Sequence, residues 1–224
     1  MWNGKMKAFT FTFDDGNFED KRLAALFDKY GLKCTFNIIG SRLIRAERKH
    51  PPTKLSIEEM LEIYKNHEIA MHTYTHPYLT DLTRECIAYE VDADYARIHA
   101  QLGVSPVGIA YPCGAYNETV LDVLRERGVK YGRTNRSSYG FDLPTEPLEW
   151  EFTCRHHEKE LWELAERFVS MKPDRPQLFS VMGHSYEFKT EDDWEKIEKF
   201  CEFISNRDDI FYCTNAEGLF GGGI

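Results

Sequence analysis

The chain has 224 residues, 42% of them hydrophobic, and its 37 Asp and Glu against 28 Lys and Arg give a net charge of −9. This length suits one α/β domain over residues 1–224, and the acidic balance without a Lys/Arg cluster excludes nucleic acid and anionic membranes as expected partners. No apolar run is long enough to span a bilayer, and the first predicted strand begins within ten residues, so we expect a cytoplasmic protein unless a leader was removed.

Apolar strands alternate with amphipathic helices along the chain. Phe9, Phe11 and Phe13 alternate with threonines, the two-residue period of a strand, and residues 17–30 place their apolar side chains on one helical face. Further predicted strands cover 33–39, 68–71, 107–111, 129–133, 150–153, 177–182 and 210–213, and further helices cover 57–66, 83–102, 117–127, 158–171 and 190–204.

Two polar stretches interrupt this pattern. The prolines of ERKHPPTK, residues 47–54, predict irregular structure, and residues 134–147 predict a long functional loop. Strands that alternate with helices run parallel with the helices outside. We therefore expect an α/β fold in which about seven or eight strands close into a barrel, with the carboxyl ends of the strands at one mouth.

Two adjacent acids, Asp14 and Asp15, end the first predicted strand. Asp and Gly are depleted in buried strands, and an unpaired carboxylate is costly in a core, so the pair lies at the strand's carboxyl end. Ligands bind at this edge in folds of alternating strands and helices, which favours a functional site. An Asp-Gly turn that caps the next helix explains the same stretch equally well.

A pair of histidines, His72 and His76, follows the third predicted strand in the motif HTYTH. A spacing of four places both imidazoles on one side of a helical turn, as in many transition-metal sites, although such a pair is more often two surface residues. Both this pair and the two acids fall at strand carboxyl ends. One carboxylate with two histidines leaves coordination positions open, which is typical of a catalytic metal.

Four motifs in order, FTFDDG, HTYTH, AYPCG and MGH, resemble those of the polysaccharide deacetylases, also called the NodB homology domain or carbohydrate esterase family 4. The resemblance implies a distorted (β/α) barrel with one divalent metal ion, often zinc, with Co, Mn or Ni as other candidates. It implies that Asp14 is the general base and His184 the general acid. The implied metal ligands are Asp15, His72 and His76.

These implied roles agree with the chemistry of amide hydrolysis. The reaction needs an electrophile on the carbonyl oxygen, a nucleophile at the carbon and a proton for the departing nitrogen. A metal supplies the first and activates a water as the second, Asp14 can take the proton of that water, and His184 has an imidazole pKa near neutrality. A buried histidine bound to loop backbone is the alternative for His184.

The third motif, AYPCG, implies a substrate-binding turn. In the family a backbone N–H of this turn binds the substrate oxygen, which would be the amide of Cys113 here. Pro112 and Gly114 would shape the turn, and Tyr111 belongs to the same predicted substrate-binding stretch. The thiol of Cys113 is a less favoured candidate for a metal ligand.

An arginine that orients the base in the family is replaced by Ala110 at the start of this motif. The next predicted strand should end at the same mouth with Arg133 near its tip. We therefore predict that Arg133 takes over the role, because a guanidinium can hold both oxygens of the Asp14 carboxylate. An arginine paired with a surface acid is the alternative of equal weight.

The fourth family motif, an acid and tryptophan cluster, is not clearly present. LEWEF around Trp150 is the nearest candidate, so Trp150 is a predicted substrate contact, although a lone tryptophan after a loop is more often a packing residue. Tyr186 and Glu187 follow His184 and could either reach the same mouth or cap the next loop.

The predicted function is metal-dependent hydrolysis of an N-acetyl group on an amino sugar or oligosaccharide. One alternative is a metal amidohydrolase acting on a small non-sugar amide, which a cytoplasmic location favours. The other is a carbohydrate-binding domain that lost catalysis with its arginine. Retention of Asp14 argues against the second alternative, because metal and sugar binding alone would not need it. The oligomeric state is left open.

Overall fold

The structure is a computed structural model that describes residues 1–45 and 54–221. The predicted irregular stretch 47–54 lies outside these residues except for Lys54. All strands named below belong to one sheet, and every pairing between them is parallel. The strands are β1 (Lys7–Asp14), β2 (Cys34–Ile38), β3 (Glu68–Met71), β4 (Gly108–Ala110), β5 (Tyr131–Ser137), β6 (Trp150–Phe152), β7 (Cys154–Arg155), β8 (Gln177–His184) and β9 (Ile210–Tyr212).

One extended segment closes this sheet into a barrel. The strand order is β6-β5-β4-β3-β2-β1-β8-β7, with β9 paired to the first half of β1. The end strands β6 and β7 are successive in the chain and separated only by Thr153, whose backbone amide donates to the Ser180 carbonyl. The segment thus joins β5 on one side to β8 on the other. The expected distorted (β/α) barrel is confirmed.

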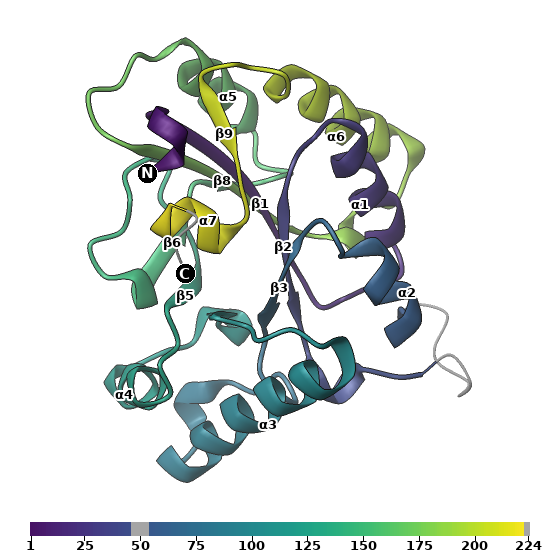
Figure 1. The fold of residues 1–224 in the computed structure, drawn as a ribbon, viewed down its shortest axis with the longest axis vertical. Coiled ribbons are helices and arrows are strands. Elements are labelled where there is room, and N and C mark those ends of the chain that lie inside the picture. Colours follow the sequence, from purple (N-terminus) through teal and green to yellow (C-terminus); the bar gives the residue numbers. More distant parts are fainter. Residues whose placement is uncertain (46–53, 222–224) are drawn as a thin grey trace.

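Most helices cover the outside of this barrel, as Figure 1 shows. Among the helices in the described ranges, none combines the length and apolar character that a membrane span requires. The α-helices are α1 (Asp20–Lys29), α2 (Ile57–Ile63), α3 (Arg84–Leu102), α4 (Glu118–Glu126), α5 (Leu161–Ser170), α6 (Glu191–Ile204) and α7 (Asn215–Phe220). Short 3-10 helices are η1 (Trp2–Gly4), η2 (Gly40–Arg42), η3 (Leu79–Asp81), η4 (Pro112–Gly114), η5 (Pro147–Glu149) and η6 (Ser185–Glu187).

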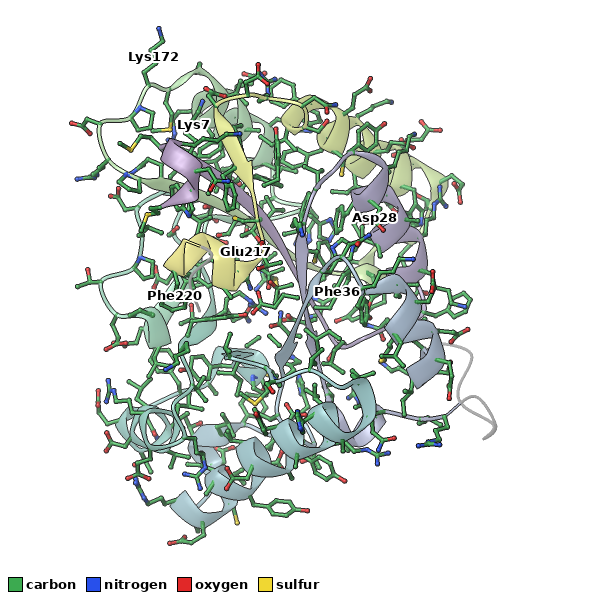
Figure 2. The ribbon with its side chains drawn as sticks, in the orientation of Figure 1. Lys7, Asp28, Phe36, Lys172, Glu217 and Phe220 are labelled. Atoms are coloured by element: carbon green, nitrogen blue, oxygen red, sulfur yellow. The ribbon has the colours of Figure 1, made fainter. Side chains whose placement is uncertain are left out.

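The main apolar core lies between the sheet and these outer helices. Phe11 of β1 stacks on Phe27 of α1 with ring centroids 4.2 Å apart, and Phe36 of β2, which is labelled in Figure 2, stacks on Tyr64 at the end of α2 at 4.3 Å. Such fully buried aromatic side chains each contribute about 1.5–3 kcal/mol to stability. The alternation read from the sequence therefore directs the β1 phenylalanines outward and its threonines inward.

The helix α7, which the sequence analysis did not predict, enters the inside of the barrel, where it contacts polar side chains of β1 and also belongs to a smaller apolar cluster. Asn215 at the start of α7 donates to the Thr12 hydroxyl at 3.2 Å and accepts from Thr10 at the same distance. Figure 2 labels Glu217 and Phe220 on this helix, in the middle of the ring of strands. Thr214 and Glu217 form a capping box, a sequence signal that could have revealed the helix.

Because the strands are parallel, their carboxyl ends meet at one mouth. β1 ends at Asp14, and β8 ends directly opposite it at His184. β5 continues to Ser137, so the predicted loop 134–147 begins four residues later than expected. The reason is that Ser137 still pairs with Phe152 of β6, beyond an irregularity in the register.

Candidate metal centre and active site

Asp15, His72 and His76 converge at the mouth of the barrel. Oδ1 of Asp15 lies 3.9 Å from Nε2 of His72 and 3.9 Å from Nε2 of His76. One ligand atom from each residue falls within 4.8 Å of the others. A transition metal bound by histidine and carboxylate sits about 2.0–2.2 Å from each donor atom, so these three atoms lie close enough to share one ion.

Local structure fixes these three residues in position. Nδ1 of His72 lies 2.9 Å from the Ala110 carbonyl, which holds the proton on Nδ1 and leaves the Nε2 lone pair facing Asp15. Burial lowers the pKa of His72, which favours the neutral imidazole that a metal requires. Asp15 and His76 have positive φ angles of 81° and 65°, and such strained backbone is common at functional sites. The donor set therefore fits a divalent metal.

Asp14 lies next to this cluster in a buried and charged environment. Nη2 of Arg133 contacts both carboxylate oxygens at 2.5 Å, and the Asn37 amide donates to Oδ1 at 2.8 Å. Its Oδ2 lies 4.0 Å from Nε2 of His72 and 3.9 Å from Nε2 of His184. Burial raises the pKa of Asp14, but its neighbours, with the Arg133 guanidinium first among them, outweigh this effect and lower the pKa to about 2.

Arg133 reaches Asp14 from β5, the neighbour of the strand β4 in which Ala110 replaces the family arginine. Arg133 of β5 is the direct register partner of Ala110 of β4. The Arg133 side chain is only 1% exposed, and its Nη1 donates to the Thr134 carbonyl at 3.0 Å. The contact with Asp14 is made by a single guanidinium nitrogen and not by the two-nitrogen fork. The role of this contact in catalysis remains a prediction.

His184 is held by Glu187, the residue whose place the sequence left undecided. Oε2 of Glu187 accepts from the His184 backbone amide at 3.0 Å, and Oε1 lies 3.5 Å from Nδ1 of His184. The same Oε2 lies 2.8 Å from Nε2 of His156. Burial lowers the pKa of His184, but Glu187 and Asp14 outweigh it, so the pKa is raised. Glu187 therefore caps η6 and contacts His184, whereas Tyr186 is the one of the two that lines the pocket at the mouth.

Most of the predicted site residues share one pocket of about 260 Å³. This volume accommodates an acetamido group, while the rest of a larger substrate would lie outside. The residues that line it include Asp14, Asp15, His72, His76, Tyr111, Cys113, Arg133 and His184, together with Asn135, Arg155, Met182 and Tyr186.

Comparison with known proteins identifies the family. Residues 3–132, more than half of the chain, match the polysaccharide deacetylase family model. The chain belongs to the polysaccharide deacetylase family. The matched segment contains the Asp14-Asp15 pair, both histidines of HTYTH and the third motif, and it ends one residue before Arg133.

Two curated relatives match the chain over part of their length. YlxY of Bacillus subtilis (strain 168) is 27% identical over 123 residues, which are 54% of this chain and 35% of YlxY. Chitin deacetylase 1 of Cryptococcus neoformans var. grubii serotype A (strain H99) is 34% identical over 100 residues, which are 44% of this chain and 19% of that protein. The matches thus span about a third and a fifth of these relatives.

A solved structure extends the likeness to the whole fold. A protein of Mycobacterium smegmatis, crystallised as a candidate polysaccharide deacetylase, superposes with a TM-score of 0.69 at 18% sequence identity. The superposition covers 96% of this chain and 89% of that one. At this identity the likeness shows the shared polysaccharide deacetylase fold.

The third motif of this member of the polysaccharide deacetylase family forms the tight turn η4. Cys113 is exposed with a φ of 54°, and Gly114 follows with a φ of 72°. A Cβ on Gly114 would lie 2.4 Å from Cβ of Asn135, so only glycine fits there. Tyr111 is buried and donates to the Leu148 carbonyl at 2.7 Å. Pro112 is buried as well, and neither it nor Gly114 is among the pocket-lining residues.

Trp150 is not brought to the site. Its side chain is 2% exposed and packs edge-on against Tyr131 in an apolar cluster inside the barrel. It is absent from the described residues that line the active-site pocket. The alternation of side chains along β6 directs Trp150 into this cluster, so the structure supports packing and not the predicted substrate contact.

Proposed function

We propose that this protein is a metal-dependent hydrolase that removes an N-acetyl group from an amino sugar or oligosaccharide, with residues 1–224 acting as one catalytic domain. One observation carries the proposal. Oδ2 of Asp14 lies 4.0 Å from Nε2 of His72 in the candidate metal cluster and 3.9 Å from Nε2 of His184. A carboxylate base, an imidazole acid and a set of metal-ligating atoms thus surround one point of the pocket.

Asp15, His72 and His76 would hold the divalent ion. Two imidazoles and one carboxylate suit zinc, with cobalt, manganese or nickel as alternatives. When bound, such an ion polarises the amide carbonyl and lowers the pKa of a water. Oδ1 of Asp15 also lies 3.5 Å from Nη1 of Arg42, an exposed side chain.

Asp14 would accept the proton of the attacking water. A pKa of about 2 keeps this carboxylate ionised throughout the working pH range. Arg133 and Asn37 hold Asp14 from the side of the barrel interior, so that its Oδ2 stays turned toward His72 and His184. This restraint would prevent Asp14 from becoming a further metal ligand.

His184 would donate a proton to the departing nitrogen. Its raised pKa keeps the imidazolium populated near neutral pH, where an amine leaving group needs a proton. Oε1 of Glu187 lies 3.5 Å from Nδ1 of the imidazole, and Nε2 lies 3.9 Å from Oδ2 of Asp14. The backbone amide of Cys113, which lines the same pocket, would bind the substrate oxygen.

The family and the pocket support the proposed substrate class. A volume of about 260 Å³ holds an acetamido group, and the exposed ring of Tyr186 lies beside His184, with centroids 5.0 Å apart. A partly exposed aromatic ring at the rim suits stacking against the apolar face of a sugar. The relative from Cryptococcus neoformans, a chitin deacetylase by name, supports an N-acetylated sugar.

The decisive experiment is acetate release from N-acetylglucosamine and its oligomers, compared with a panel of small acetamides. The zinc-loaded protein should act on the sugars, and His72→Ala should abolish this activity. His99→Ala, which changes an exposed histidine on α3, serves as the matched control and should leave it unchanged. A folded, metal-loaded protein without acetate release from any N-acetylated sugar would contradict the proposal.

A further inference from the structure

A second group of metal-ligating side chains lies behind His184. It comprises His156 and His157, which follow β7, and Glu187 of η6. Oε2 of Glu187 lies 2.8 Å from Nε2 of His156 and 3.8 Å from Nδ1 of His157. In the described part of the chain, the ligand atoms of His, Cys, Asp and Glu converge within 4.8 Å in just two groups, this one and the cluster at the mouth.

A separate pocket of about 330 Å³ opens beside these residues. Its wall includes all three of them and two more acids, Glu158 and Asp193, against one base, Lys196. Oε2 of Glu158 is buried and has no hydrogen-bond partner in the described structure. Three carboxylates and one ammonium favour a cation in this pocket, and an unpartnered buried carboxylate oxygen supports the same conclusion.

His156 is fixed in place before any ligand binds. Its ring lies against Phe188 at 4.5 Å and stacks on Phe13 at 5.9 Å, and its side chain is 7% exposed. His157 is half exposed at the pocket and can therefore exchange a ligand with solvent.

We propose that His156, His157 and Glu187 bind a second divalent transition-metal ion, separate from the cluster of Asp15, His72 and His76. Two imidazoles and one carboxylate form a donor set that suits zinc, and the adjoining pocket leaves room for water as a further ligand. The site differs from the catalytic cluster in position and in every ligand.

The second ion would act on the catalytic acid through Glu187. Oε2 of Glu187 also accepts from the His184 amide at 3.0 Å, so an ion bound at this oxygen competes with the contact that positions His184. Zinc beyond one equivalent is therefore expected to lower turnover. This regulatory effect rests on the proposed deacetylase function, whereas binding of the ion does not.

Zinc titration of the tag-free, chelator-stripped full chain by isothermal calorimetry tests the site. Wild type should bind two ions per chain, His72→Ala and His157→Ala one each, and the double variant none. Loss of the His157 ligand should lower the zinc affinity of this site by more than about 100-fold, since mutating even a residue that only hydrogen-bonds to a ligand lowers metal affinity by about 10–100-fold. His99→Ala, an exposed histidine elsewhere, should still bind two.

Thermal unfolding provides a second measurement that does not depend on enzymatic activity. Zinc should raise the Tm of His72→Ala but not that of the His72→Ala/His157→Ala variant, because only the former keeps the second site. A wild type that saturates at one ion, or a His157→Ala variant that still binds two, would overturn the proposal. Because neither the zinc titration nor thermal unfolding depends on acetate release, failure of this site can be distinguished from failure of the proposed function.

Discussion

Arg133 contacts Asp14 across the inside of the barrel. Three strands, β2, β3 and β4, separate β1 from β5 in the sheet, yet one guanidinium nitrogen lies 2.5 Å from both carboxylate oxygens. Only a sheet that curves back on itself permits this contact. The geometry of the predicted base thus depends on the curvature of the barrel as well as on the residues at its mouth.

Arg133→Lys should lower kcat by roughly 10–100-fold while metal content stays at the wild-type level. A lysine ammonium keeps the charge but cannot contact both oxygens and the Thr134 carbonyl at once. Steady-state kinetics with acetate detection and metal analysis on the same sample measure the two effects. Because Ala110 and Arg133 are register partners, a second variant that adds Ala110→Arg to Arg133→Ala should recover part of the activity. A kcat for Arg133→Lys within about twofold of wild type would show that Arg133 does not orient the base.

Asp14→Asn and Asp15→Asn should behave differently although the residues are neighbours. Asp14→Asn should keep the metal and lose turnover by roughly 10²–10⁴, the usual contribution of a general base. Asp15→Asn should lose metal, since it removes one of three ligands. Equal metal loss in both variants would mean that the two roles have been assigned wrongly.

Glu187→Gln should shift the alkaline limb of the kcat–pH profile to lower pH. His184 must be protonated to donate, so turnover falls as the pH rises through its pKa. Burial lowers that pKa, and Glu187 is among the groups that raise it; a neutral Gln removes this contribution, and the imidazolium is lost at lower pH. The shift should be clear on acetamides and weak on aryl acetates, whose leaving groups need no proton. An unchanged alkaline limb on acetamides would argue against His184 as the acid.

Asp20→Asn should stabilise the protein, increasingly so from pH 4 to pH 7. Burial raises the pKa of Asp20 from 3.8 to about 7, and the 2.6 Å hydrogen bond from Tyr64 offsets this only in part. A carboxyl group with a raised pKa stabilises the folded state at low pH, and this contribution is lost as the pH rises through about 7. The loss in the free energy of unfolding is at most about 1.4 kcal/mol for each pH unit between the two pKa values. Tm values measured across this range test the effect, with exposed Glu163→Gln as the control. A Tm difference that does not vary with pH would contradict it.

The sequence predicted what depends on local pattern. The alternation of Phe9, Phe11 and Phe13 predicted β1, and the barrel followed from alternating strands and helices. The acids Asp14 and Asp15 were predicted to meet the pair His72 and His76 because both pairs fall at strand ends, and parallel strands bring those ends together. Family resemblance supplied the roles, and the structure brings the three side chains within reach of one ion.

What the sequence could not supply depends on register and on distance through space. Trp150 was expected at the substrate, but the face of a three-residue strand cannot be read from so short a pattern, and the side chain packs inside the barrel. α7 is a six-residue helix stabilised by barrel contacts, so its amphipathic pattern was too short to detect. The position of Glu187 could not be decided from the sequence, because only the fold shows that it contacts both His184 and His156.

The pairing of β1 with β8 determines the order in which the site can assemble. Lys7 pairs with Gln177, 170 positions later in the chain, and Asp14 pairs with His184 at the same distance. Contacts of such high contact order form slowly, because a long loop must close first. During synthesis the strands that carry Asp15, His72 and His76 emerge well before β8. The three metal ligands are therefore present early in a nascent chain. Until β8 is made and pairs with β1, one edge of β1 stays unpaired and prone to aggregation, and Asp14 lacks the proposed acid His184.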